Sequence, residues 1–78
     1  MKILILTKRN FDESYALQEH IRKVLPVTTC DLFMGNVNSA NVNIEQYNLI
    51  WMFYYPYIVN QKTLRRNDKW VNTHPSYL

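Results

Sequence analysis

The chain has 78 residues, enough for one domain, and a domain of this size buries only about 60% of the surface that its unfolded chain exposes. With 47% hydrophobic and 19% charged residues, the composition excludes a disordered protein. The single cysteine, Cys30, excludes an internal disulfide, and the apolar run at the N-terminus is too short for a signal peptide or a membrane span. We therefore expect a cytoplasmic globular protein without a membrane partner, in which Cys30 is a small buried hydrophobe.

The first half of the chain predicts a strand, a helix and a second strand. The apolar run "KILILT" at residues 2–7 is typical of a strand covered on both faces. Asn10 is expected to cap the following helix, with Glu13 completing a capping-box-like pair. An apolar stripe follows at helical spacing, formed by Leu17, Ile21, Val24 and Leu25. Pro26 ends the helix, and the β-branched stretch at residues 27–33 predicts the second strand.

The second half of the chain predicts two further strands. Residues 34–43 hold the only glycine and four asparagines, which indicates a loop, and a helical turn is expected at residues 44–47. Leu49–Phe53 is almost continuously apolar, so we expect a central strand with a neighbour on each side. Asn60 is expected to cap a short helix, and residues 69–74 to form the last strand. The order of elements predicts an α/β, Rossmann-like, three-layer fold with a mainly parallel sheet, here as an incomplete domain.

The net charge is a mild +3, and part of the excess is concentrated near the end of the chain. Between Gln61 and Trp70 only Asp68 opposes the cationic residues, which are Lys62, Arg65, Arg66 and Lys69. Such a cluster could contact nucleic acid or phosphate. A solvated helix face is the favoured interpretation, and nucleic acid is the less favoured partner.

Two polar side chains lie close together at the end of the last expected strand. Asn72 and His74 are two residues apart, so on a strand they point the same way, and Pro75 then ends the strand. In open parallel sheets, ligands bind outside the carboxyl ends of the strands. The Asn72 amide is a permanent donor and the His74 imidazole can donate in either protonation state, so the pair could stabilise an oxyanion. A polar turn after a strand is the alternative.

The segment "VNTHPSYL" resembles the Asn-x-His-Pro-Ser-x-Leu signature of the folate-dependent formyltransferases. This family includes glycinamide ribonucleotide, methionyl-tRNA and sugar N-formyltransferases. "MKILILT" is similar to the first strand of the family, and "YNLIWMFYYPYIV" to the strand and tyrosine-rich turn that precede the signature. The helix expected within "NQKTLRRN" also falls in the matching place. The resemblance covers most of the chain, but only the signature is specific.

The resemblance implies transfer of a formyl group from N10-formyltetrahydrofolate to an amine. It implies that Asn72 donates a hydrogen bond to the oxyanion, that His74 polarises the same oxygen, and that Tyr54, Tyr55 and Tyr57 border the folate. For these tyrosines, aromatic packing at the edge of the sheet is an equally good interpretation. A glycine-rich loop after the first strand is missing, and "HPSYL" is more similar to the sugar N-formyltransferases, so the favoured acceptor is a nucleotide-linked amino sugar.

The family's third catalytic residue is an aspartate downstream of the signature, and these 78 residues hold no position for it. We therefore expect residues 1–78 to be the N-terminal portion of a catalytic domain, truncated after the signature and inactive alone. The alternatives are a non-catalytic interaction module or a decayed fragment of the same ancestry, and a small basic nucleic-acid-binding domain. The 14% aromatic content also suggests homo-oligomers formed through exposed apolar surface.

Overall fold

The computed structural model describes residues 1–73, which form a Rossmann-like α/β domain. Its elements are, in chain order, β1 (Lys2–Leu6), α1 (Asp12–Val24), β2 (Thr29–Phe33), the short 3-10 helix η1 (Ile44–Gln46), β3 (Leu49–Phe53), α2 (Gln61–Leu64) and β4 (Trp70–Thr73). The predicted order of strands and helices is confirmed. In this part of the chain, no helix combines the length and the hydropathy needed to cross a membrane.

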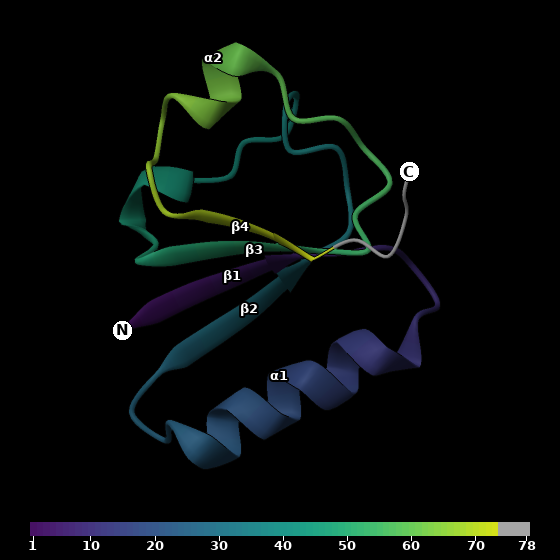
Figure 1. Ribbon diagram of the computed structural model, residues 1–78, viewed down its shortest axis with the longest axis vertical. Coiled ribbons are helices and arrows are strands. Elements are labelled where there is room, and N and C mark those ends of the chain that lie inside the picture. Colours follow the sequence, from purple (N-terminus) through teal and green to yellow (C-terminus); the bar gives the residue numbers. More distant parts are fainter. Residues whose placement is uncertain (74–78) are drawn as a thin grey trace.

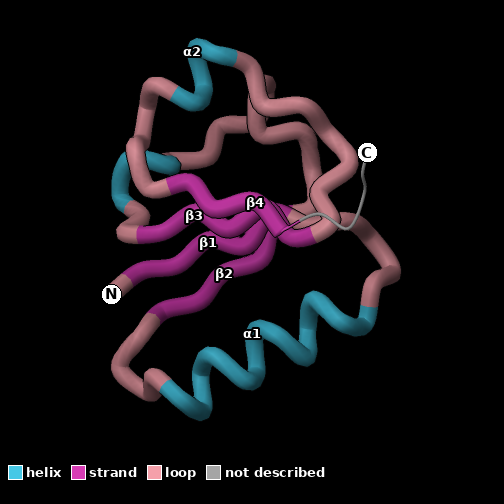
Figure 2. The backbone as a smooth tube through the Cα atoms, viewed as in Figure 1, coloured by secondary structure: helices cyan, strands magenta, loops and turns pink. Residues whose placement is uncertain are grey.

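All four strands are parallel and lie in the order β2-β1-β3-β4 (Figures 1 and 2). The prediction that Leu49–Phe53 is a central strand is confirmed, because β3 lies between β1 and β4. In the register of this sheet, Ile50 pairs with Leu4 on one side and with Trp70 on the other. Ile50 is fully buried, as the apolar run predicts.

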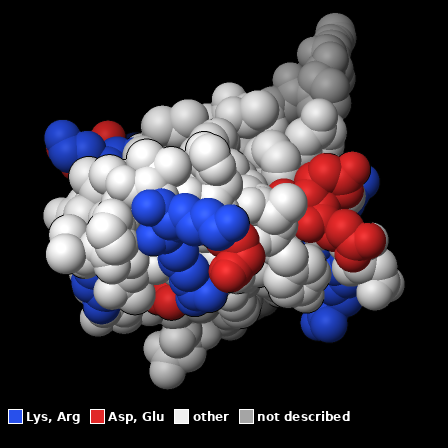
Figure 3. All heavy atoms as spheres, turned by 90° about the horizontal axis from the view of Figure 1, so that it is seen from below, with Lys and Arg blue, Asp and Glu red and all other residues white. Residues whose placement is uncertain are grey.

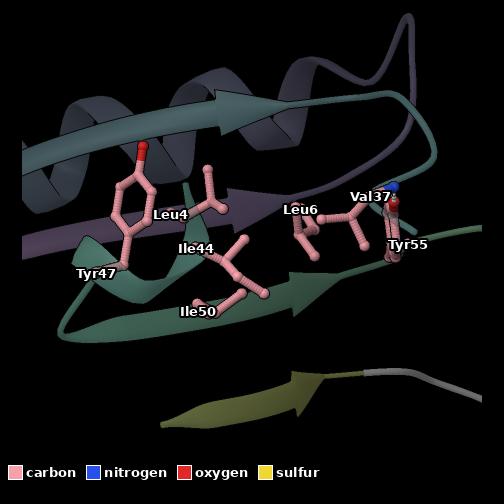
Figure 4. Close-up of a cluster of buried hydrophobic side chains, with 7 residues drawn as sticks. All are labelled: Leu4, Leu6, Val37, Ile44, Tyr47, Ile50 and Tyr55. Atoms are coloured by element: carbon pink, nitrogen blue, oxygen red, sulfur yellow. Dashed lines mark hydrogen bonds between the residues drawn. The ribbon is translucent and has the colours of Figure 1, made fainter. Parts of the chain in front are cut away.

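Helices cover the two faces of the sheet unequally, and each face carries its own core (Figure 1). On one face α1 packs over β1 and β2, and its Ile21 is buried against Ile3, Ile5 and Cys30 of these strands. On the other face, η1, α2 and the loops enclose a second cluster, drawn in Figure 4: Leu4, Leu6, Val37, Ile44, Tyr47, Ile50 and Tyr55. Side chains alternate between these faces along each strand, which is why one short strand can serve both cores. Cys30 is buried, as predicted, and burial raises the pKa of its thiol.

Helix α1 ends just before Pro26, as predicted, but its N-cap and the last part of its apolar stripe differ from the prediction. Asn10 does not cap it: the helix begins at Asp12, the N-cap position is Phe11, and Asn10 adopts a left-handed turn with φ of 56°. The Phe11 ring packs against Phe53 and Tyr54, and this contact fixes where the helix begins. The predicted stripe is also wrong near its end, because Val24 is exposed just before the chain turns toward β2. Leu25 is exposed there as well.

The remaining element boundaries follow the sequence closely. The helical turn expected at residues 44–47 is η1, and the Asn60 side chain caps α2 by accepting a 2.8 Å hydrogen bond from the Thr63 N–H. The second strand is shorter than predicted, since it begins at Thr29 and the Val27 side chain is exposed. These boundaries place the loops that follow β1 and β3 at the same edge of the sheet.

Candidate functional site

The topology creates a divergence at the carboxyl ends of β1 and β3. These strands are neighbours, but the chain leaves β1 toward α1 on one face and leaves β3 toward α2 on the other (Figure 1). In open α/β sheets, ligands bind at such a point, outside the carboxyl ends of the strands. A candidate site is therefore expected among the loops at this edge.

A pocket of about 440 Å³ opens near this edge, on the side of the sheet that faces α2. Its lining consists of Met52, Tyr55, Pro56, Tyr57, Ile58, Val59, Leu64 and Asn72. Met52 and Asn72 are partners in the register of β3 and β4, so both side chains rise from the same face of the sheet. Most of the wall is apolar or aromatic, and Asn72 supplies a side-chain amide. This composition suits a flat, partly polar ligand.

The structure brings Asn72 together with two of the three predicted tyrosines. Tyr55 is buried, and its hydroxyl accepts a 2.8 Å hydrogen bond from the Val37 N–H and donates to the Gly35 carbonyl. Figure 4 shows Tyr55 and Val37 lying close together. Burial raises the pKa of the Tyr55 hydroxyl. Tyr57 is 42% exposed and its ring centre lies 5.4 Å from that of Tyr55, so Tyr57 presents an open aromatic face.

Tyr54 does not line this pocket. Its ring lies 5.1 Å from the Phe11 ring and 5.0 Å from the Phe53 ring, and the Lys8 ammonium is 5.8 Å from its centre. Tyr54 also has a positive φ of 56°, which turns the chain sharply at the end of β3. For Tyr54, aromatic packing at the edge of the sheet therefore accounts for the side chain.

Asn72 lies on β4 one residue before the strand ends, with an exposed side chain, as the strand-end interpretation requires. The other predicted catalytic residue, His74, lies outside the described residues. The pocket also has walls that were not predicted. Met52 could have been found by counting two residues on from Ile50, whereas nothing local to α2 marks Leu64 as a lining residue.

The basic cluster near α2 is partly neutralised. The Arg66 guanidinium forms two hydrogen bonds with Glu45, at 2.7 and 2.8 Å, and one of 2.9 Å with the Val42 carbonyl. These bonds from Arg66 hold the pKa of Glu45 at about 2. Lys69 lies 4.0 Å from Asp68. These partners do not favour a surface built for phosphate.

The opposite side of the molecule, over α1, carries both signs of charge (Figure 3). Acidic residues lie in the first turn of α1 and basic residues in its last turn, which complements the helix dipole. This face is therefore not a basic patch of the kind that recognises nucleic acid. Among residues 1–73, no three His, Cys, Asp or Glu side chains are placed to hold a metal ion.

No family model matches the sequence, and no curated protein or solved structure matches it either. The fold defines the class of the domain, which is a small α/β domain with an all-parallel sheet. The formyltransferase relationship rests on the residues of the signature and on the tyrosine-rich turn, and it stays a prediction.

Proposed function

We propose that this chain carries the folate side of a formyltransferase active site. One observation supports the proposal most directly: three of the predicted site residues, Asn72, Tyr55 and Tyr57, line a single pocket at the carboxyl ends of parallel strands. The proposed reaction is transfer of a formyl group from N10-formyltetrahydrofolate to an amine, with a nucleotide-linked amino sugar as the favoured acceptor.

The pocket fits a pteridine in chemical character. The exposed Tyr57 ring offers a stacking surface, and Pro56, Val59 and Leu64 supply apolar walls. The Asn72 side-chain amide does not titrate, so it can donate a hydrogen bond to a carbonyl oxygen at any pH near neutrality. In the proposed reaction the folate supplies the formyl group, and Asn72 orients and polarises its oxygen. His74 has the second role that the resemblance implies.

Binding is the first measurement, because turnover in the family also requires a carboxylate that follows the signature. We propose to titrate the chain with 5-formyltetrahydrofolate, a stable analogue of the donor. Tyr57→Ala should weaken binding by up to about tenfold through loss of stacking. Tyr15→Ala is the matched control, since Tyr15 is 49% exposed on α1, on the other side of the sheet. Equal weakening by both variants, or no binding by the parent chain, would reject the folate pocket.

A second variant tests the role of the amide. Asn72→Asp keeps the size of the side chain but replaces the amide donor with a carboxylate, which only accepts hydrogen bonds. We expect this change to weaken binding of the formyl group more than binding of tetrahydrofolate without it. Formyl transfer to a panel of amino-sugar nucleotides then tests the acceptor. If the panel shows neither binding nor transfer, the non-catalytic module of the same ancestry becomes the better interpretation.

A further inference from the structure

Two loops that are far apart in the sequence are tied together beside the candidate pocket. One is the segment at residues 34–43, between β2 and η1, and the other is the segment at residues 54–60, between β3 and α2. The Tyr55 hydroxyl makes the first connection, because it bonds the Gly35 carbonyl and the Val37 N–H. A second connection comes from the opposite loop, where Asn38 reaches the backbone of Ile58 and Asn60.

Asn38 makes this second connection with both ends of its side-chain amide. Its Nδ2 donates to the Ile58 carbonyl at 2.7 Å, and its Oδ1 accepts from the Asn60 N–H at 2.9 Å. A carbonyl and an N–H two residues apart on an extended chain are the groups that a neighbouring strand would bond. The Asn38 side chain thus takes the place of a strand beside residues 58–60. Its own N–H bonds the Asn36 Oδ1 at 3.0 Å, which holds its backbone in place.

The clamped segment forms one wall of the pocket and leads directly into α2. Ile58 and Val59 line the pocket, while Asn60 caps α2 and so fixes Leu64, which is another lining residue. The Ile58 side chain is 90% exposed, so packing of this residue does little to hold the segment. Val59 packs against the core cluster, whereas on either side of it the backbone of Ile58 and Asn60 is held by the polar contacts of Asn38.

We propose that Asn38 is a positioning residue, which holds residues 58–60 against the 34–43 loop and so sets the shape of the pocket lined by Tyr57 and Asn72. The identity of the ligand rests on the proposed function, but the clamp does not. Among side chains of this length, only the planar amide of asparagine presents a donor and an acceptor side by side. Alanine removes both groups, and aspartate keeps the acceptor alone.

Amide hydrogen exchange followed by NMR tests the clamp directly. In Asn38→Ala, exchange of the Asn60 N–H should rise by about tenfold, as expected for loss of one hydrogen bond, while amides of β1 keep their rates. In Asn38→Asp, the Asn60 N–H should stay protected, because the acceptor is retained, and this variant also serves if the alanine variant does not fold. Asn41→Asp is the matched control: Asn41 is exposed in the same loop, and no side-chain hydrogen bond joins it to a described residue. Unchanged exchange at Asn60 in Asn38→Ala, or loss of protection in both Asp variants, would overturn the clamp.

The link from the clamp to the pocket needs its own measurement. In Asn38→Ala, the methyl signals of Val59 and Leu64 should shift, and the affinity for 5-formyltetrahydrofolate should fall by about tenfold. Ile21→Val is the control for a general loss of stability, since Ile21 lies on α1 and is buried against the other face of the sheet. The same loss of affinity in Ile21→Val, or unchanged methyl signals in Asn38→Ala, would refute the positioning role. If the parent chain does not bind the folate, the proposed function fails, whereas the exchange rates and methyl signals still decide the role of Asn38.

Discussion

Replacing Tyr55 with phenylalanine removes one oxygen atom and both hydrogen bonds that the Tyr55 hydroxyl makes to the neighbouring loop beside the pocket. The ring stays in place, so packing is preserved and only the polar contacts are lost. The Val37 N–H is then buried without its partner, since Val37 is 1% exposed, and the Gly35 carbonyl loses its donor. An unsatisfied buried donor costs about 1–3 kcal/mol, and we expect Tyr55→Phe to lower the free energy of unfolding by about 2–3 kcal/mol.

This loss is large for a small domain, whose free energy of unfolding is about 4–12 kcal/mol at 78 residues. With a dependence on urea of about 1 kcal/mol per molar, the unfolding midpoint should fall by about 2–3 M. Tyr57→Phe is the matched control, because Tyr57 is 42% exposed and the change should leave the free energy of unfolding within about 0.5 kcal/mol. Urea unfolding followed by tryptophan fluorescence measures both. Equal midpoints for the two variants would refute the claim that the Tyr55 hydroxyl supports the loops.

Ile50→Asp should prevent folding, because Ile50 is fully buried in the middle of the sheet and a charge there would be unpaired; a thermal midpoint equal to that of the parent would mean that β3 is not central. The bonds from Arg66 lower the pKa of Glu45 from about 4.5 to about 2, so this pair stabilises the fold above pH 4.5 and its contribution is lost as the pH falls toward 2. As the pH falls over this range, the thermal midpoint should therefore drop more in the parent than in Glu45→Gln. The difference should be modest, because solvent screens the pair. A steeper drop in Glu45→Gln would contradict a stabilising role for the pair. Asn60→Ala should lower the free energy of unfolding by about 1 kcal/mol through loss of the α2 cap. Asn43→Ala is the control, because Asn43 stands at the start of η1 and its side chain makes no capping bond. The difference between their urea midpoints measures the cap, and equal midpoints would show that the cap adds no stability.

Signals carried by neighbouring residues predicted the strands well. The continuous apolar runs of β1 and β3 required burial on both faces, and the structure places these strands at the centre of the sheet. The start of α1 could not be predicted in the same way. Asn10 has the chemistry of a cap, but the packing of Phe11 against Phe53, some forty residues later in the chain, decides where the helix begins. Such a contact between distant residues leaves no local pattern.

In the candidate site, too, some features could be predicted from neighbouring residues and others depend on contacts between distant residues. The pairing of Asn72 with the tyrosine-rich turn followed from its place at the end of a strand and from the resemblance. The separation of Tyr54 from Tyr55 and Tyr57 did not follow from strand alternation, because Tyr54 lies just after β3 and turns the chain with a φ of 56°. The role of Asn38 could not be predicted from the sequence, because its partner Ile58 lies twenty residues later and its loop contains several similar asparagines.

The place of β1 in the sheet has a consequence for how the protein is made. Of the four strands of the sheet, β1 is synthesised before both of its neighbours, and Ile3 must wait for Leu49 before its second neighbouring strand exists. Contacts between residues so far apart slow folding, because a long loop has to close before any strand pairing stabilises it. Until β2 and then β3 have been synthesised, the run "ILIL" lacks one or both of its partner strands, and an unpaired apolar strand of this kind is a binding site for chaperones and a starting point for aggregation. The yield of folded protein should therefore depend on the rate of translation between residues 6 and 53 more than on any later part of the chain.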